Sequence, residues 1–336
     1  MQPAVLIQNL QKRYGTETAV ADVSIAVEPG QIFGLLGPNG AGKTTILRCL
    51  CTLQLPDGGR LEVCGIDVRQ NPRAVRRRLG YVAQEVALDK VLTGRELLQL
   101  QADLYHMSRS QARARIDAVL KLLGLSERAD ERTGTYSGGL RKRLDLAAGL
   151  LHQPEVLVLD EPTVGLDIQS RLAIWDFLRD VKARGMTVLI TSHYLEEIDA
   201  LADRVAIVDK GKVIAEGTPT ELKDTVGGDR LTLKVQEFTS RPEAERALDV
   251  LQTLSFVRSS AINGSQGNAL NLFVTIDEAA AVGGVRQKLD EVGLPIFSLA
   301  YSRPSLDDVY LAATGQTLND AELAAAEAGP ADKPKK

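Results

Sequence analysis

The sequence predicts an α/β fold followed by a smaller α+β domain, and three observations support this prediction. A glycine-rich loop at residues 37–45 lies between a short apolar run and a helical pattern. Further apolar runs at 156–159 and 187–190 lack polar alternation, as expected of parallel strands buried on both faces. Beyond about residue 225 the pattern changes, and shorter alternating strands and helices follow. We therefore expect two domains, at 1–224 and 225–317.

The composition is that of an ordinary globular protein and excludes several functional classes. The 336 residues carry 40 basic and 44 acidic side chains, a formal net charge of −4, so no overall positive field recruits nucleic acid or anionic lipid. No apolar run approaches the roughly 18 residues of a membrane-spanning helix, and the N-terminus lacks a signal-peptide pattern, so we expect a cytoplasmic chain. The cysteines lack metal-ligand spacing and are expected to be small buried residues: Cys49, Cys51 and Cys64.

The loop at 37–45 matches a phosphate-binding motif in the expected setting of strand, loop and helix. It reads Gly37, Pro38, Asn39, Gly40, Ala41, Gly42, Lys43, Thr44 and Thr45. Glycines let the backbone bend tightly and point successive N–H groups at phosphate oxygens, and the helix N-terminus that follows favours an anion. Lys43 is predicted to reach the β- and γ-phosphates, and the Thr44 hydroxyl to coordinate Mg²⁺. The loop therefore predicts binding of a nucleoside triphosphate.

Two strands are expected before the loop, at 4–7 and 20–27, as an antiparallel flank. Tyr14 lies on the connection between them, where an exposed ring is either an adenine-stacking platform or a turn residue. After the loop, a short apolar strand at 79–83 ends at Gln84. A polar residue there either touches Mg²⁺ or the attacking water, or is an ordinary strand-end glutamine.

The next segment is largely helical. Residues 93–133 show helical periodicity, and we expect a helical subdomain at about 85–150 beside the nucleotide core. A hydroxyl and two glycines open one of its helices: Ser137, Gly138 and Gly139. This arrangement favours an anion, although in isolation it would be only a helix cap.

Two of the apolar strands end in ionisable residues. The run at 156–159 closes on Asp160 and Glu161, and two carboxylates at the end of a buried strand are costly without a cation, so Mg²⁺ is expected there. Because strand side chains alternate, Asp160 suits the metal shell and Glu161 suits polarising the attacking water. His193 follows the next strand, in the same row of strand ends, which favours donation to a γ-phosphate over a structural role.

The second domain has the pattern β-α-β-β-α-β, which predicts a small ferredoxin-like arrangement. The expected elements are a strand at 231–235, a helix at 247–254, a hairpin of strands at 255–260 and 269–276, a helix at 278–292 and a strand at 295–302. No titratable cluster in this domain suggests chemistry. The end of the chain, 318–336, is rich in Ala and Glu and then in Pro and Lys, and is expected to be disordered.

These motifs, in this order, resemble those of the nucleotide-binding subunit of an ABC transporter. The resemblance covers about residues 4–220 and rests on the phosphate loop, Gln84, the signature Ser137-Gly138-Gly139, the run Leu159-Asp160-Glu161-Pro162, the turn Gly165-Leu166-Asp167 and His193. The stretches at 91–96, 192–197 and 305–310 are further similar to ATPase subunits of daunorubicin-resistance-type multidrug exporters. The fold that the resemblance implies is a P-loop NTPase with a RecA-like core, an antiparallel β flank and a helical subdomain.

The resemblance also implies a role for each matching residue. Tyr14 corresponds to the aromatic residue that stacks on adenine, and Gln84 to the residue that links the metal ion to the membrane partner. Glu161 matches the catalytic carboxylate and His193 the switch histidine. Asp167 lies in the loop that crosses the dimer.

The same resemblance implies how the subunit works. Two copies pair head to tail, so that ATP and Mg²⁺ on the phosphate loop of one are covered by Ser137, Gly138 and Gly139 of the other. A separate integral-membrane permease contacts the segment from Gln84 to about residue 105, and ATP hydrolysis drives export of a drug, lipid or natural product. The subunit would lie on the inner face of the cell membrane and contact it only through the permease. The cargo is not implied, because such a subunit touches its permease and not the transported molecule.

The sequence departs from the usual signature motif of the family at two positions, and one alternative function remains open. Leu140 stands where many relatives carry glutamine, which puts one polar contact in doubt, and Tyr136 replaces the usual leucine; the backbone donors of 137–139 survive both changes. The alternative is a soluble ABC ATPase with a regulatory or translation-associated role and no permease. That class usually has two nucleotide domains in one chain, whereas this chain has one phosphate loop and one signature.

Overall fold

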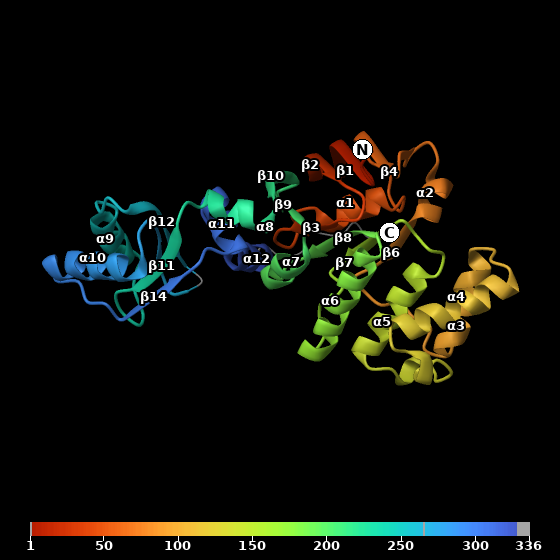
Figure 1. Ribbon diagram of the computed structural model, residues 1–336. Coiled ribbons are helices and arrows are strands. Elements are labelled where there is room, and N and C mark those ends of the chain that lie inside the picture. Colours follow the sequence, from red (N-terminus) through yellow and green to blue (C-terminus); the bar gives the residue numbers. More distant parts are fainter. Residues whose placement is uncertain (1, 265, 328–336) are drawn as a thin grey trace. The chain divides into compact units, whose positions relative to one another are not determined.

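The chain divides into two compact units. The computed structural model describes residues 2–264 and 266–327 (Figure 1). Contacts between residues group the chain into Met1–Val213 and Ile214–Lys336.

The first unit is built on a sheet that has ten strands among the described residues. In spatial order they are β5 (Ile66–Asp67), β4 (Gly58–Val63), β1 (Val5–Tyr14), β2 (Glu17–Val27), β10 (Lys212–Gly217), β9 (Arg204–Asp209), β3 (Ile32–Leu36), β8 (Thr187–Ser192), β7 (Val156–Asp160) and β6 (Leu79–Val82). Strands β9, β3, β8, β7 and β6 are parallel, and β1, β2, β4 and β5 form the antiparallel flank. The predicted core and flank are confirmed.

Three of the parallel strands that lead to functional residues are buried along their whole length. Every residue of β3, β7 and β8 is buried, and their apolar side chains pack against helices in the manner of an α/β fold. The helices are α1 (Lys43–Leu50), α2 (Pro72–Arg78), α6 (Ile168–Ala183) and α7 (Leu195–Leu201). Since parallel strands end at the same edge of a sheet, the residues after β3, β6, β7 and β8 gather there.

The helical subdomain lies between β6 and β7 (yellow and yellow-green in Figure 1). It contains α3 (Gly94–Leu104), α4 (Arg109–Leu122), the short 3-10 helices Ser126–Arg128 and Thr133–Thr135, and α5 (Gly138–Leu150). Capping boxes at Thr93 and Ser108 start α3 and α4, because each hydroxyl accepts a backbone N–H that the first helical turn leaves without a partner.

The second unit has the predicted β-α-β-β-α-β order. Its elements are α8 (Pro219–Thr225), β11 (Asp229–Lys234), α9 (Arg241–Leu251), β12 (Val257–Asn263), β13 (Ala269–Val274), α10 (Glu278–Glu291), β14 (Ser298–Ser302), α11 (Leu306–Thr314) and α12 (Leu318–Glu327). The strands form an antiparallel sheet in the order β12-β13-β11-β14. Leu231 and Leu233 of β11 pack with Val285 and Leu289 of α10 in its core.

The structure differs from the sequence-based boundaries at three places. The units divide at Val213, before the expected 224, because α8 packs against α11 within the second unit. Tyr14 ends β1 instead of lying on a connection, since the hairpin turns within Gly15 and Thr16 and Tyr14 still pairs with Glu17.

The expectation of disorder from 318 onward needs a correction for residues 318–327, which form α12. Thr317 and Asp320 hydrogen-bond each other at its start, and Leu318 and Ala321 are buried. Alanine and glutamate are strong helix formers, so an Ala/Glu-rich segment can form a helix where its start is capped and its apolar side chains are buried. The rest of the expected tail, 328–336, lies outside the described residues.

Candidate nucleotide-binding and catalytic site

The phosphate loop leaves β3 and enters α1. Its first and last glycines have positive φ angles, +155° at Gly37 and +105° at Gly42, which other residues rarely adopt. A Cβ atom added to Gly42 would lie 2.5 Å from the carbonyl oxygen of Ala19. Only glycine therefore lets the loop pass this close to β2.

A cavity of about 280 Å³ opens beside the loop. Residues predicted from four segments of the sequence line it: Tyr14, Asn39, Gly40, Gly42, Lys43, Thr44, Thr45, Gln84 and Glu161. Tyr14 is 42% exposed, and its hydroxyl hydrogen-bonds Gln54. The aromatic ring therefore belongs to the wall of the cavity and not to the core.

Lys43 is bent over its own loop. The side chain is buried, and Nζ donates hydrogen bonds of 2.6 Å to the carbonyl oxygen of Gly37 and 3.0 Å to that of Pro38. The ammonium also lies 4.0 Å from Oε1 of Glu161. The ammonium group of Lys43 thus places a positive charge at the base of the cavity, next to the Glu161 carboxylate.

The hydroxyl of Thr44 and the carboxylate of Asp160 converge at the end of β7. Thr44 Oγ1 donates a 3.2 Å hydrogen bond to Asp160 Oδ1, and Asp160 is 1% exposed. The same carboxylate oxygen accepts a 2.7 Å hydrogen bond from Oγ1 of Thr191. Buried oxygen atoms in such an arrangement match the donor set that Mg²⁺ prefers.

Glu161 follows Asp160 in a strained backbone conformation. Its φ is +46°, a region that costs a non-glycine residue about 1–3 kcal/mol and persists only where neighbouring contacts enforce it. One such contact is the hydrogen bond of 3.0 Å from its N–H to Thr191 Oγ1.

Three groups surround the Glu161 carboxylate. Gln84 Nε2 donates a 2.8 Å hydrogen bond to Oε2, His193 Nδ1 lies 3.4 Å from the same oxygen, and Lys43 is the cation already described. Burial by itself raises the pKa of Glu161, but the hydrogen bond and charge of His193 together with the charge of Lys43 outweigh it, so the pKa is below its usual value. The carboxylate is therefore ionised at neutral pH.

The signature residues start a helix away from this cavity. Ser137 caps α5 by accepting a 3.3 Å hydrogen bond from the N–H of Leu140, which needs no glutamine at that position. Tyr136 is buried, and its hydroxyl donates to the carbonyl oxygen of Arg128. Ser137, Gly138 and Gly139 do not line the cavity beside the loop.

Asp167 caps α6 and lies close to the signature helix. Its carboxylate accepts hydrogen bonds of 2.8 Å from the N–H and from the hydroxyl of Ser170. A Cβ atom added to Gly139 would lie 2.3 Å from that hydroxyl oxygen. Ser170 therefore connects Asp167 to the signature helix within one chain.

Comparison with known proteins agrees with this geometry. A family model described as ABC transporter matches residues 20–164. The daunorubicin resistance ATP-binding protein DrrA3 of Streptomyces coeruleorubidus is 43% identical over 312 residues, 93% of this chain and 96% of the relative. The doxorubicin resistance ATP-binding protein DrrA of Mycobacterium tuberculosis is 40% identical over 318 residues, 93% of each chain.

The chain belongs to the ABC transporter family. It is an ATP-binding, ATP-hydrolysing subunit of the daunorubicin-resistance type. Among solved structures, an ATP-binding subunit of an ABC transporter matches this ABC ATPase with a TM-score of 0.61 at 27% identity, covering 67% of this chain and 93% of the other. A dimeric ATP-binding cassette in a post-hydrolysis state, bound to ADP and Pi, matches with a TM-score of 0.58 at 26% identity, covering 64% and 98%.

Sequence reasoning missed one residue of the ABC ATPase site, Thr191. This residue is fully buried and its hydroxyl joins Asp160 to the N–H of Glu161. Its position two residues before His193, at the end of a buried strand, was the available signal. The hydroxyl was overlooked because threonine is common in strands for packing reasons alone.

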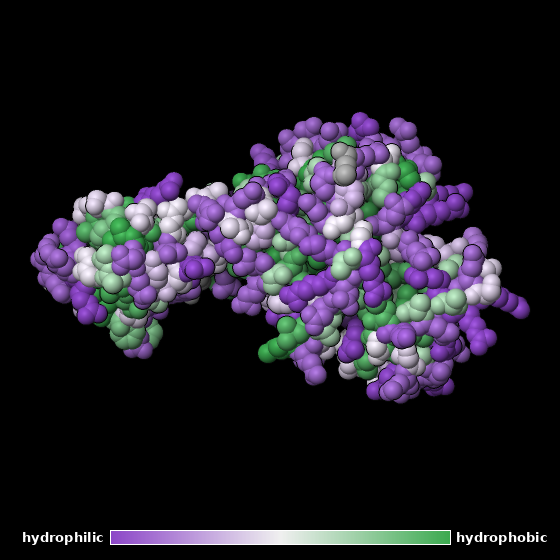
Figure 2. Space-filling model, in the orientation of Figure 1, coloured by the Kyte–Doolittle hydropathy of each residue, from purple (hydrophilic) through white to green (hydrophobic). Residues whose placement is uncertain are grey.

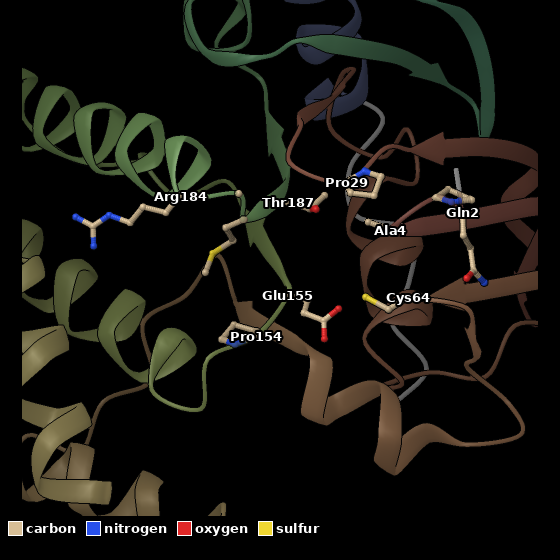
Figure 3. Close-up of a pocket in the computed structure, with 11 residues that line it drawn as sticks. Gln2, Ala4, Pro29, Cys64, Pro154, Glu155, Arg184 and Thr187 are labelled. Carbon is tan, nitrogen blue, oxygen red and sulfur yellow. The ribbon is translucent and has the colours of Figure 1, made fainter.

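The ABC ATPase has further cavities away from the phosphate loop. One of about 490 Å³ lies where β7 and β8 begin, at the opposite ends of the strands from the site. Figure 3 shows Glu155 and Thr187 on one of its sides and Gln2 and Cys64 on the other. Across the described residues, no helix combines the length and the apolar character that a membrane span requires.

Proposed function

We propose that this ABC ATPase powers export through a separate membrane permease, as a head-to-tail homodimer. The observation that carries the proposal is the extent of the match to resistance and export proteins. Three relatives named for daunorubicin or doxorubicin resistance align with 93% to 95% of this chain, and a Nod factor export ATP-binding protein of Paraburkholderia xenovorans is 38% identical over 95% of it. The similarity therefore includes the second unit and is not limited to the ATP-binding core.

ATP would occupy the cavity beside the phosphate loop. Backbone N–H groups of the loop and the N-terminus of α1 bind the phosphates, and Lys43 exchanges its hydrogen bonds with Gly37 and Pro38 for phosphate oxygens. Tyr14, on the rim, is positioned to stack on the adenine ring.

The residues around Asp160 fit Mg²⁺. Thr44 and Asp160 offer oxygen ligands 3.2 Å apart. The side-chain oxygen of Gln84 is a third candidate ligand, since its side-chain nitrogen donates a hydrogen bond to Glu161. No group of three or more His, Cys, Asp or Glu residues suited to a metal occurs in the described part of the chain, as expected where phosphates and water complete the shell. Bound there, Mg²⁺ would neutralise charge on the β- and γ-phosphates.

Glu161 and His193 would carry the hydrolysis step. The ionised Glu161 carboxylate polarises the attacking water and accepts its proton. His193, in contact with that carboxylate, senses the γ-phosphate and donates to it. Gln84 connects the same carboxylate to the segment that follows β6.

The cavity by itself offers ATP only half of a site. Ser137, Gly138 and Gly139 lie outside it, yet they present a helix N-terminus and a hydroxyl, which favour an anion. We infer that these residues cover the ATP of a second copy. Binding of two ATP molecules between two copies would then join them, and hydrolysis would release them.

A groove of about 400 Å³ offers a surface for the permease. It lies between the core and the helical subdomain, where apolar side chains reach the surface among hydrophilic ones (Figure 2). Leu88, Leu92, Leu97 and Leu100 line it, and all follow Gln84 in the segment predicted to contact the partner. An exposed apolar groove of this kind suits an amphipathic helix of a partner.

Co-purification tests the proposal against a role without a permease. The tagged chain, extracted in mild detergent, should carry a polytopic membrane protein with it, and Leu100→Glu in the groove should abolish that association. The matched control is Leu172→Glu, also exposed but on α6, outside both the groove and the segment from Gln84 to about residue 105. Recovery of the parent chain on ribosomes, without any membrane protein, would favour the regulatory or translation-associated alternative.

A further inference from the structure

Arg171 and Tyr194 make a contact that the roles above leave unexplained. The guanidinium carbon of Arg171, on α6, lies 4.6 Å from the ring centre of Tyr194. Its Nε is shielded from solvent and has no hydrogen-bond partner among the described residues. A shielded arginine nitrogen usually pairs with a carboxylate. Here the electron-rich face of an aromatic ring takes that place.

Tyr194 also touches the switch histidine. The ring centres of Tyr194 and His193 are 4.2 Å apart at an interplanar angle of 43°, so the two rings are in direct contact. The N–H of Tyr194 donates a 2.9 Å hydrogen bond to Ser192 Oγ, which fixes the backbone between the two rings and β8. His193 Nδ1 in turn lies 3.4 Å from Glu161. The ring of Tyr194 therefore limits the positions that the imidazole can take beside the carboxylate.

The other end of this contact lies on the first turn of α6. Arg171 follows Ser170, whose hydroxyl is bonded to Asp167 and abuts Gly139. The first turn of α6 thus carries both Arg171, which contacts Tyr194, and Ser170, which contacts Gly139 of the signature. A shift of Asp167 or Gly139 would move this turn as a unit, because packed interiors transmit displacement and do not absorb it.

We propose that Arg171 and Tyr194 are positioning residues that hold His193 against Glu161 and couple its placement to the first turn of α6. The inference rests on the proposed function, in which Gly139 covers the ATP of a second copy and Asp167 lies in the loop that crosses the dimer. ATP turnover at the phosphate loop of one chain then depends on the position of the signature residues of that same chain, which cover the ATP bound to the second copy. This coupling runs within one chain and adds to whatever passes across the dimer.

Helices α6 and α7 do not depend on the contact between Arg171 and Tyr194 to stay packed together. Trp175 Nε1, one turn further along α6, donates a 3.0 Å hydrogen bond to Oε1 of the buried Glu197 on α7. Removing the guanidinium or the ring should therefore leave α6 and α7 docked. A loss of turnover would then reflect the position of His193 and not unfolding.

Steady-state ATPase assays of the full chain, together with calorimetric titration of MgATP, test the proposal. Tyr194→Leu removes the ring and should lower kcat by about tenfold or more, since small misplacements of catalytic groups have effects of this size, while the Kd for MgATP changes by less than about twofold. Tyr194→Phe keeps the ring and should retain most of kcat. Arg171→Leu should lower kcat as Tyr194→Leu does, and Arg171→Lys, which keeps the charge, should restore part of it.

The dependence on His193 separates positioning from simple destabilisation. In a His193→Ala background, Tyr194→Leu should cause no further loss, because the residue that it positions is absent. Arg179→Leu, on the exposed side of the same helix, serves as the control and should leave kcat unchanged. The proposal is overturned if Tyr194→Leu and Arg171→Leu both keep kcat within about twofold of the parent, or if Tyr194→Leu lowers kcat equally with and without His193.

Failure of the proposed function would look different. In that case Glu161→Gln would not form an ATP-dependent dimer, whatever the Tyr194 variants do. If the dimer forms and the Tyr194 and Arg171 variants turn over normally, the proposed function stands and only this inference falls.

Discussion

The side-chain nitrogen of Gln84 lies 2.8 Å from the carboxylate oxygen Oε2 of Glu161. This hydrogen bond joins the end of β6 to the end of β7, two neighbouring strands that are far apart in the sequence. It also orients the one carboxylate of the cavity that His193 and Lys43 keep ionised. The proposed acceptor of the water proton and the first residue of the segment predicted to meet the permease are therefore in direct contact.

Glu161→Gln should separate ATP binding from turnover. The amide keeps the size of the side chain but cannot accept a proton, so hydrolysis should fall by about 100-fold or more while MgATP still binds. An ATP-bound dimer should accumulate, detectable as a shift in size-exclusion chromatography coupled to light scattering. Hydrolysis at the parent rate would show that Glu161 is not the residue that activates water.

Lys43→Met should weaken MgATP binding by about tenfold or more, because the phosphates lose the nearest side-chain cation. The methionine keeps the apolar stem and removes the ammonium that now bonds to Gly37 and Pro38. Isothermal titration calorimetry measures the change. Lys121→Met, on the exposed side of α4, is the matched control and should bind as the parent does; equal affinity in all three proteins would contradict the assignment.

Asp145→Asn should stabilise the isolated chain in a pH-dependent way. Burial raises the pKa of Asp145 to about 6, although the charge of Lys142 lowers it. Because the folded state then holds the proton more tightly than the unfolded state, this carboxyl contributes stability at acid pH that is lost as the pH rises through about 6. The asparagine variant avoids that loss.

Urea denaturation checks this expectation. Near pH 8 the Asn variant should be more stable than the parent by roughly 2 kcal/mol, allowing for partial solvent access, and near pH 4 the difference should vanish. Asp180→Asn, on the exposed side of α6, should show no such trend. A constant difference across the pH range would indicate a packing effect instead.

Gly138→Ala and Gly139→Ala should differ in stability. A Cβ atom on Gly139 would lie 2.3 Å from Ser170 Oγ, whereas one on Gly138 meets only a side-chain carbon of Leu166, at 3.9 Å. Gly139→Ala should therefore lower the free energy of unfolding by about 1–3 kcal/mol, as overpacking does, and Gly138→Ala should change it little. Equal melting temperatures of the two variants would contradict the close contact between α5 and α6.

Much of the nucleotide site follows from local sequence, because its parts are short motifs tied to strand ends. The glycines that give the loop its positive φ angles, the hydroxyl of Thr44 and the paired acids Asp160 and Glu161 can all be read from their neighbours in the chain. Parallel strands align their ends, so the prediction that these residues meet required only the fold class. The hydrogen bond from Thr44 to Asp160, and the cavity that Thr44 and Glu161 both line, confirm that they do.

Other features depended on how segments pack. Residues 318–327 form α12 where composition predicted disorder, because Thr317 and Asp320 cap the start of the helix. Strand β1 extends to Tyr14, because a tight hairpin pairs Tyr14 with Glu17. The boundary between the units moved to Val213 because α8 packs on α11. Contacts of this kind join residues whose sequence positions carry no signal of each other.

By itself, the sequence determined that the chain is an ATP-binding protein. It also predicted which residues hold the phosphates and which carboxylate activates water, since these properties belong to motifs whose residues are adjacent or follow buried strands. Only the tertiary structure decided that Thr191 bridges Asp160 and Glu161, and that Arg171 reaches the ring beside His193. Those contacts arise where β7 meets β8 and α6 meets α7. The packing of whole elements, and not the pattern within any one of them, brings the side chains together.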